Sequence, residues 1–128
     1  SDIPWEHYKG SNGLSLMDTF PTVQFYDYTK LPTRKVPVNY HLTVSYSGAN
    51  VKYAEKVQKT AHNIAVVFRD KNSIPKHYLG RRVINGDKTD LRFTDDSGIV
   101  VALYAKGAAK KDHSGFVVDV PQNTLAIA

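Results

Sequence analysis

Cysteine is absent from the 128 residues of this chain. The absence excludes disulfide bonds, thiolate metal sites, a cysteine nucleophile and an iron–sulfur cluster held by this chain alone, and it fits a reducing, cytoplasmic compartment. Long apolar runs are missing too, because the longest, Gly98–Ala105, is far shorter than the about 20 residues needed to cross a bilayer. We therefore expect a protein without a cofactor of its own and without a membrane segment.

Length and composition indicate one domain. A chain of 128 residues, 41% of them hydrophobic and 23% charged, matches one globular unit, and we assign residues 1–128 to a single α/β domain. The sequence begins at Ser1 without an initiator methionine. We therefore expect either a processed protein or a fragment of a longer one.

Charge is unevenly placed along the chain. The net charge is +5; residues 1–50 hold four acidic and four basic side chains, whereas residues 51–128 hold eight acidic and thirteen basic ones. The excess of positive charge therefore lies in the second part, which favours an anionic partner such as nucleic acid. A solvated basic surface without a partner is the alternative.

Short apolar runs alternate with loops and one amphipathic stretch. A helix is expected over Val51–His62 with Asn50 as its N-cap, and single helical turns at Ser15–Thr19 and Lys76–Leu79. Strands are expected at Thr22–Tyr28, Val38–Tyr46, Asn63–Phe68, Arg81–Ile84, Leu91–Phe93, Gly98–Ala105 and Phe116–Val120. This order predicts an α/β fold with a mainly parallel sheet, either a partial (β/α) barrel or an open sheet with few helices.

Polar side chains gather where four of these strands end. Because the carboxyl ends of parallel strands share one edge of a sheet, where ligand sites form, these side chains are expected to converge. The candidates are Asp27, Tyr28 and Lys30 at the end of the first strand, Ser45 and Ser47 at the end of the second, Asp87 after the fourth and Lys106 after the sixth. The alternative is that these ends are polar because loops are solvated.

Other patterns are weaker. Ser47–Asn50 precedes a helix, whose free N–H groups favour an anion, but it lacks the glycines of a phosphate-binding loop. The five histidines have no metal-site spacing, so no metal site is predicted from them. A divalent cation would need the acidic cluster of Asp87, Asp90, Asp95 and Asp96, which turn chemistry explains better. A basic set that could contact a nucleic-acid backbone consists of Arg81, Arg82, Lys106, Lys110 and Lys111.

Seven segments in consistent order resemble a known family. They are SDIPWE (1–6), VQFYDYTK (23–30), NYHLTVSYS (39–47), NIAVVF (63–68), VINGDKTDLRF (83–93), VALYAKG (101–107) and KDHSGFVV (111–118). Together they resemble the carboxy-terminal half of the bacteriophage gene product 88 family. The resemblance implies phage origin, the cytoplasm of an infected bacterium, and a partial barrel like that of radical-SAM enzymes. It also implies a missing upstream half that carries a cysteine cluster.

Three functions follow as hypotheses. The first is a small phage enzyme, or an enzyme fragment, that binds a phosphate- or carboxylate-bearing ligand at the strand ends. Its catalytic residues would be Asp27, Lys30 and Asp87, and its ligand-binding residues Ser45, Ser47, Asn50, Arg92 and Lys106. The second is a nucleic-acid-associated protein, and the third a non-catalytic protein-interaction module. Because a half barrel leaves edges and apolar surface uncovered, we expect a homo-oligomer or docking onto the missing upstream segment.

Overall fold

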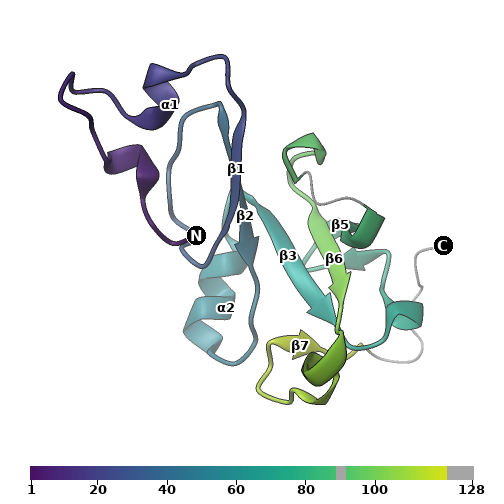
Figure 1. The fold of residues 1–128 in the computed structure, drawn as a ribbon. Coiled ribbons are helices and arrows are strands. Elements are labelled where there is room, and N and C mark those ends of the chain that lie inside the picture. The colour runs from purple at the N-terminus through teal and green to yellow at the C-terminus, as the bar shows by residue number, and fades with distance from the viewer. Residues whose placement is uncertain (89–91, 121–128) are drawn as a thin grey trace.

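The computed structural model describes residues 1–88 and 92–120. In that part of the chain seven strands form one sheet in the order β1–β2–β3–β6–β5–β4, with β7 beside β3 (Figure 1). The strands are Phe25–Thr29 (β1), Tyr40–Ser45 (β2), Asn63–Phe68 (β3), His77–Tyr78 (β4), Arg81–Asn85 (β5), Val100–Tyr104 (β6) and Val117–Val118 (β7). The α-helices described are Leu16–Thr19 (α1) and Val51–Gln58 (α2).

The sheet is mainly parallel, which confirms the predicted α/β class. Each described pair of neighbouring strands runs in the same direction except β4 and β5, which are antiparallel. In Figure 1 the arrowheads of β2, β3 and β6 accordingly point to one end of the molecule. Of the two predicted forms the sheet takes the open one, because β1 and β4 end the strand order and are not paired with each other.

The main core lies between one face of the sheet and α2. Val44 of β2 and Tyr46 just after it are buried in this core, whereas Tyr40 and Leu42 form a second buried cluster with Met17. From α2, Ala54 and Val57 pack against this face. The remaining buried members of the cluster are Ile64, Val66, Phe68, Ile74, Val83, Val100 and Ala102. Burying this many aliphatic side chains, at about 25 cal/mol per Å² of apolar surface, is the main stabilising term of the fold.

Helix α2 begins as predicted and ends earlier. The Asn50 side chain accepts a hydrogen bond of 3.1 Å from the Tyr53 N–H, which is the expected N-cap. The helix ends at Gln58 rather than His62. The residues that follow are bound to other elements instead: Thr60 Oγ1 donates to the Pro32 carbonyl at 2.6 Å. Tertiary contacts therefore override helical spacing over the last four residues.

The helical turn predicted at Lys76–Leu79 is wrong. His77–Tyr78 is instead strand β4, paired with β5 in an antiparallel hairpin. Leu79 and Gly80 connect them with φ values of 52° and 72°, the backbone of a tight two-residue hairpin turn. Leucine is uncommon at positive φ, so of the two turn residues only Gly80 is one that the sequence pattern associates with such a turn.

The strand predicted at Leu91–Phe93 is also wrong. Leu91 lies outside the described residues, and Arg92–Thr94 is a short 3₁₀ helix. This helix contacts β1 and β2, and the Arg92 side chain is only 1% exposed. Arg92 was expected on a strand, whereas the fold buries its guanidinium.

A segment near the described end, residues 112–119, pairs with the last residues of β3 at the carboxyl end of the sheet; we call it the closing strap. The first half of β3 pairs with β2, from Asn63 to Ala65, and its last residues pair with β7. The Gly48 N–H donates to the Gly115 carbonyl at 2.8 Å, so the strap also bonds to the chain leaving β2. The predicted strand at Phe116–Val120 is thus real but only two residues long.

The amino-terminal residues are fixed to the sheet by Arg34. Its guanidinium forms a bidentate pair with Glu6, with distances of 3.0 Å from Nε and 2.6 Å from Nη2. It also donates to the carbonyls of Ser1 and Ile3 and to the hydroxyl of Thr29. The hydrogen bonds from Arg34 hold the pKa of Glu6 below its usual value. One buried cation therefore joins three separate stretches of chain.

Candidate functional site

The carboxyl edge of the sheet contains a hollow of about 510 Å³. Four of the predicted strand-end residues line it: Tyr28 of β1, Ser45 of β2, Asp87 after β5 and Lys106 after β6. These positions adjoin because the strands are parallel and in register, with Tyr28 opposite Thr43 and Ser45 opposite Ala65. We call this space the carboxyl-edge hollow. Sequence reasoning placed these four residues together because parallel topology alone requires it.

Asp87 is the most firmly held polar group of the hollow. It follows the buried Gly86, and its N–H donates to Asn85 Oδ1 at 2.9 Å, which forms a tight turn after β5. Its carboxylate accepts from the Tyr104 N–H at 3.3 Å and from Lys106 Nζ at 3.0 Å. The carboxylate is thus oriented by two donors from the neighbouring strand end.

Lys106 brings a positive charge to the rim. Its side chain is 63% exposed although its ammonium group pairs with Asp87, and that group lies 4.7 Å from the centre of the Tyr104 ring. A cation over an aromatic face is stabilised by about 0.5–1 kcal/mol at an exposed site. The ammonium is therefore held in place while open to solvent and to a ligand.

The floor and one wall of the hollow are apolar. Its floor comes from the sheet face opposite α2, where Ala65, Val67 and Leu103 alternate with the core residues of β3 and β6. The wall is Phe116 of the closing strap. Sequence reasoning missed Phe116, because only the pairing of β7 with β3 brings the strap to this edge. No local sequence pattern predicts that pairing. Sequence reasoning also missed Tyr104, which the sequence placed within a strand and which ends β6.

Lys30 lines a second, smaller hollow of about 260 Å³ beside the first. The two hollows share Tyr28 and Ser45, so they adjoin along the same edge of the sheet. Asp2 fixes this part of the edge, since its Oδ1 accepts from the Lys30 N–H at 2.6 Å. That hydrogen bond holds the pKa of Asp2 below its usual value. Lys30 therefore extends the positive rim that Lys106 begins.

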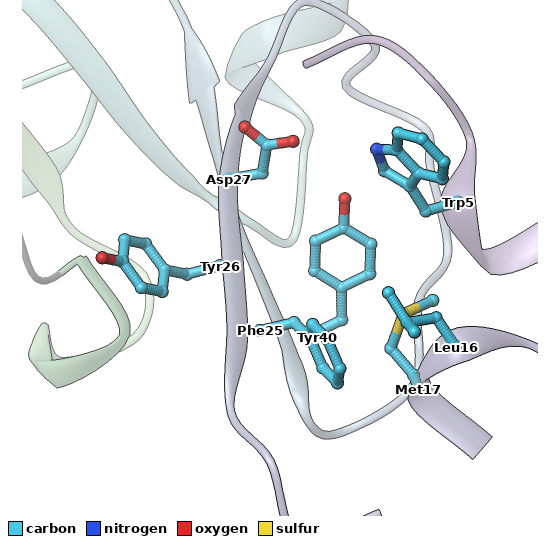
Figure 2. A pocket seen from close by; sticks show the side chains of 7 residues that line it. All are labelled: Trp5, Leu16, Met17, Phe25, Tyr26, Asp27 and Tyr40. Atoms are coloured by element: carbon cyan, nitrogen blue, oxygen red, sulfur yellow. The ribbon is translucent and has the colours of Figure 1, made fainter. Parts of the chain in front are cut away.

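Asp27 points away from the carboxyl-edge hollow. Successive strand residues face opposite sides, so Asp27 and Tyr28 cannot share one face of β1. Figure 2 shows Asp27 beside Tyr40 and Trp5, with Tyr26 directed away from the others. These residues line a separate hollow of about 230 Å³. The Asp27 carboxylate accepts from the Ser1 amino group at 2.6 Å. The structure thus separates Asp27 from Asp87, with which it was predicted to converge.

Three predicted ligand-binding residues lie outside the hollow and make internal contacts. Ser47 Oγ accepts from the Ala49 N–H at 3.2 Å, and Asn50 caps α2. Arg92 is buried beneath the edge, where it donates to the Gly86 carbonyl at 3.2 Å and lies 3.5 Å from Asp95. Burial raises the pKa of Asp95. All three residues support the edge rather than line it.

The acidic cluster considered for a cation is dispersed. Asp87 pairs with Lys106, Asp95 with Arg92 and Asp96 with Arg82, while Asp90 lies outside the described residues. In residues 1–88 and 92–120, no group of three or more acidic or histidine side chains has metal-binding geometry. The predicted basic set is dispersed as well. Arg81 and Arg82 lie at the start of β5, whereas Lys106, Lys110 and Lys111 follow the end of β6. Because β5 and β6 are parallel, these two groups lie at opposite edges of the sheet.

The fold and the hollow define an α/β protein with a partly apolar site at the carboxyl edge of its sheet. The model of the gene product 88 family matches residues 1–120, so the chain belongs to this family of phage gene products. No curated protein and no solved structure matches it. Within the described residues, no helix is long and apolar enough to span a bilayer. The family match carries no activity with it.

Proposed function

We propose that the carboxyl-edge hollow binds a small molecule with an apolar body and one phosphate or carboxylate group. The observation that carries this proposal is the convergence of Tyr28, Ser45, Asp87 and Lys106, from four separate segments, on one hollow of about 510 Å³. Small-molecule sites have this size and this mixture of an apolar lining with a few fixed polar groups. They also form preferentially outside the carboxyl ends of parallel strands.

The rim selects for an anionic group at one end of the ligand. Lys106 and, in the adjoining hollow, Lys30 supply ammonium groups on the same edge. Because Asp87 neutralises part of this charge, the rim keeps a net positive charge that one anionic group balances. Phe116, Val67 and Leu103 favour an apolar or aromatic body against the opposite wall.

Asp87 is the acid–base candidate within the hollow. Its carboxylate is oriented by Lys106 and by the Tyr104 N–H, as a group that exchanges a proton with a bound ligand has to be. Asp27, proposed for the same role from the sequence, lies on the other face of β1 and takes no part in this site. The proposal concerns binding, and it assigns no reaction.

Replacing Lys106 by methionine tests the anion end of the site. Phenyl phosphate and benzoate supply the anionic group with an apolar body, and inorganic phosphate supplies the anion alone. We expect Lys106→Met to weaken binding of the first two by about tenfold or more, because a hydrogen bond to a charged group contributes about 1.5–3 kcal/mol. Isothermal titration calorimetry measures the change.

The matched control is Lys110→Met, which removes the same charge nearby. Lys110 is exposed on the neighbouring 3₁₀ helix, Gly107–Lys111, and does not line the hollow. This variant should bind both aromatic anions like the unaltered protein. Equal loss in both variants, or no binding of either aromatic anion at millimolar concentration, would contradict the proposal.

A second function, self-association through the amino-terminal residues, is favoured by one observation. Among the described residues twelve large apolar side chains are exposed, and nine of them lie between Ile3 and Leu31. Trp5, Tyr8, Leu14 and Leu16 line one hollow of about 340 Å³, which we call the amino-terminal apolar surface. It adjoins β1, which ends the strand order. We propose a second copy of this chain as its occupant, since aromatic side chains beside an uncovered edge are typical of homodimer contacts.

Trp5→Ala tests this second proposal. Because buried tryptophans are frequent hot spots, the substitution should weaken the dimer by about tenfold or more, as measured by sedimentation velocity across a concentration series. Val51→Ala is the control, because Val51 is an exposed apolar residue on α2, away from this surface. A chain that stays monomeric at the highest concentration, or a control that dissociates equally, would rule the dimer out.

We propose that the chain corresponds to the carboxy-terminal half of longer family members and that it acts in the cytoplasm of the infected bacterium. A missing upstream half would then hold any cysteine-bound cluster. Intact mass spectrometry of the protein in the cytosolic fraction of infected cells tests both the length and the compartment.

A further inference from the structure

A basic groove of about 530 Å³ lies beside the last turn of α2 and shares no lining residue with the carboxyl-edge hollow. Helix α2 starts after β2 ends and returns to the start of β3, so its last residues lie towards the amino-terminal edge of the sheet. The groove is bounded by these last residues, by the segment that leads into β3 and by the loop after β1. Its lining consists of Pro32, Thr33, Arg34, Lys35, Val36, Lys56, Lys59, Thr60, Ala61 and His62.

The charge in this groove is all of one sign. Lys35, Lys56 and Lys59 are exposed and line it together, whereas no acidic residue does. Across residues 1–88 and 92–120, no salt bridge involves any of these three lysines. Arg34 adds little, because its guanidinium is buried against Glu6. Three ammonium groups around one concave surface concentrate anions there.

The walls of the groove are held by hydrogen bonds between its segments. Thr60 Oγ1 donates to the Pro32 carbonyl at 2.6 Å, and His62 Nε2 lies 2.5 Å from the Arg34 carbonyl oxygen. From β5, the Arg81 guanidinium donates to the carbonyls of Thr60 and His62. The hydrogen bonds from Arg81 thereby neutralise carbonyl oxygens just beyond α2 that would otherwise repel an anion. The backbone that carries the lysines is therefore held in place, which lowers the entropy lost when a ligand binds.

The lining also indicates what kind of anion fits. Apart from His62 it contains no aromatic ring, so it offers no platform on which a base could stack. Pro32, Val36 and Ala61 provide an apolar floor suited to sugar carbons, with the lysines placed for phosphates. We propose that this groove binds the phosphodiester backbone of nucleic acid without reading its sequence. The proposal is independent of the carboxyl-edge hollow.

Fluorescence anisotropy with a labelled single-stranded oligonucleotide of about 20 nucleotides tests the groove. With three lysine–phosphate contacts, the logarithm of the binding constant falls with the logarithm of salt concentration with a slope of about 2. Binding is then roughly 20-fold weaker at about 200 mM than at about 50 mM salt. The triple variant Lys35→Ala, Lys56→Ala, Lys59→Ala should bind about tenfold or more weakly at low salt and should lose most of this slope. Repeating the titration with a second oligonucleotide of different sequence should give the same affinity.

The control removes the same charge elsewhere. Lys76, Lys110 and Lys111 are exposed and outside the groove, so replacing these three by alanine should retain most of the affinity and the slope. Lys106→Met should also bind the oligonucleotide normally, which separates this proposal from that of the carboxyl-edge hollow. Equal loss in both triple variants, strong preference for one oligonucleotide, or no binding at low salt would overturn the proposal. Circular dichroism verifies that each variant is folded, since all six lysines are on the surface.

Discussion

Replacing Arg34 by methionine is expected to lower the free energy of unfolding by about 3–5 kcal/mol, the usual effect of leaving one member of a buried ion pair without its partner. Glu6 and Arg34 are both almost fully buried, with side-chain exposures of 4% and 5%. Methionine replaces the aliphatic stem of arginine and keeps its apolar contacts, so the loss reports mainly on the charge and its hydrogen bonds. Urea unfolding followed by tryptophan fluorescence measures it, because Trp5 lies in the segment that Arg34 holds.

Two further variants isolate the cause of that loss. Arg34→Lys keeps the charge but not the bidentate geometry, and it should recover only part of the stability. The double variant Glu6→Met, Arg34→Met should be more stable than Arg34→Met alone, because no carboxylate is then left buried without a cation. If the double variant is less stable than the single one, the ion pair is not the source of the effect.

Gly86→Ala is the second substitution with a large expected effect, about 2–3 kcal/mol, at the upper end of what overpacking costs. A Cβ at this position would lie 2.4 Å from Val101 Cγ1, 2.7 Å from Arg92 Nη1 and 2.9 Å from Leu103 Cδ2. These neighbours are buried or partly buried between β6 and the 3₁₀ helix at Arg92, so none can move aside without disturbing the others. Because Gly86 precedes Asp87, the variant should also weaken ligand binding in the carboxyl-edge hollow.

Thermal unfolding and the anion titration together check this result. Gly10→Ala is the matched control: its Cβ would meet only the side-chain oxygen of Asn12, at 3.3 Å, and the Leu14 carbonyl at 3.7 Å, so its stability should change little. A Gly86→Ala protein as stable as the control would show that the packing under the hollow is loose.

The sequence predicts the part of this fold that depends on local pattern. Asn63–Phe68 was predicted with the bounds that β3 has, because an unbroken apolar run between polar residues has few other interpretations. The N-cap at Asn50 and the turn at Ser15–Thr19 follow from side chains that bond within three or four residues. The mainly parallel sheet follows from the spacing of these elements.

The errors occur where distant contacts decide. Helix α2 stops early because Thr60 and His62 bond to the loop after β1, and Arg92 turns inward because Gly86 leaves room for its guanidinium. Within the candidate site, parallel strand ends predicted Tyr28, Ser45, Asp87 and Lys106 together. The face of β1 on which Asp27 lies depends on pairing with β2, and the wall at Phe116 depends on the closing strap. Neither of these two strand pairings can be predicted from a short stretch of sequence.

The closing strap has a consequence for the order of folding. Its ion pair between Arg69 and Asp119 joins residues 50 positions apart, and β7 has β3 as its strand neighbour. Because a contact of such long range closes a long loop at an entropic cost, we expect the strap to be added to a sheet that already contains β2, β3 and β6. Phe116 arrives with it. A chain that has built its sheet but not its strap has the hydrophobic core without the completed site, so assembly of the core precedes competence to bind.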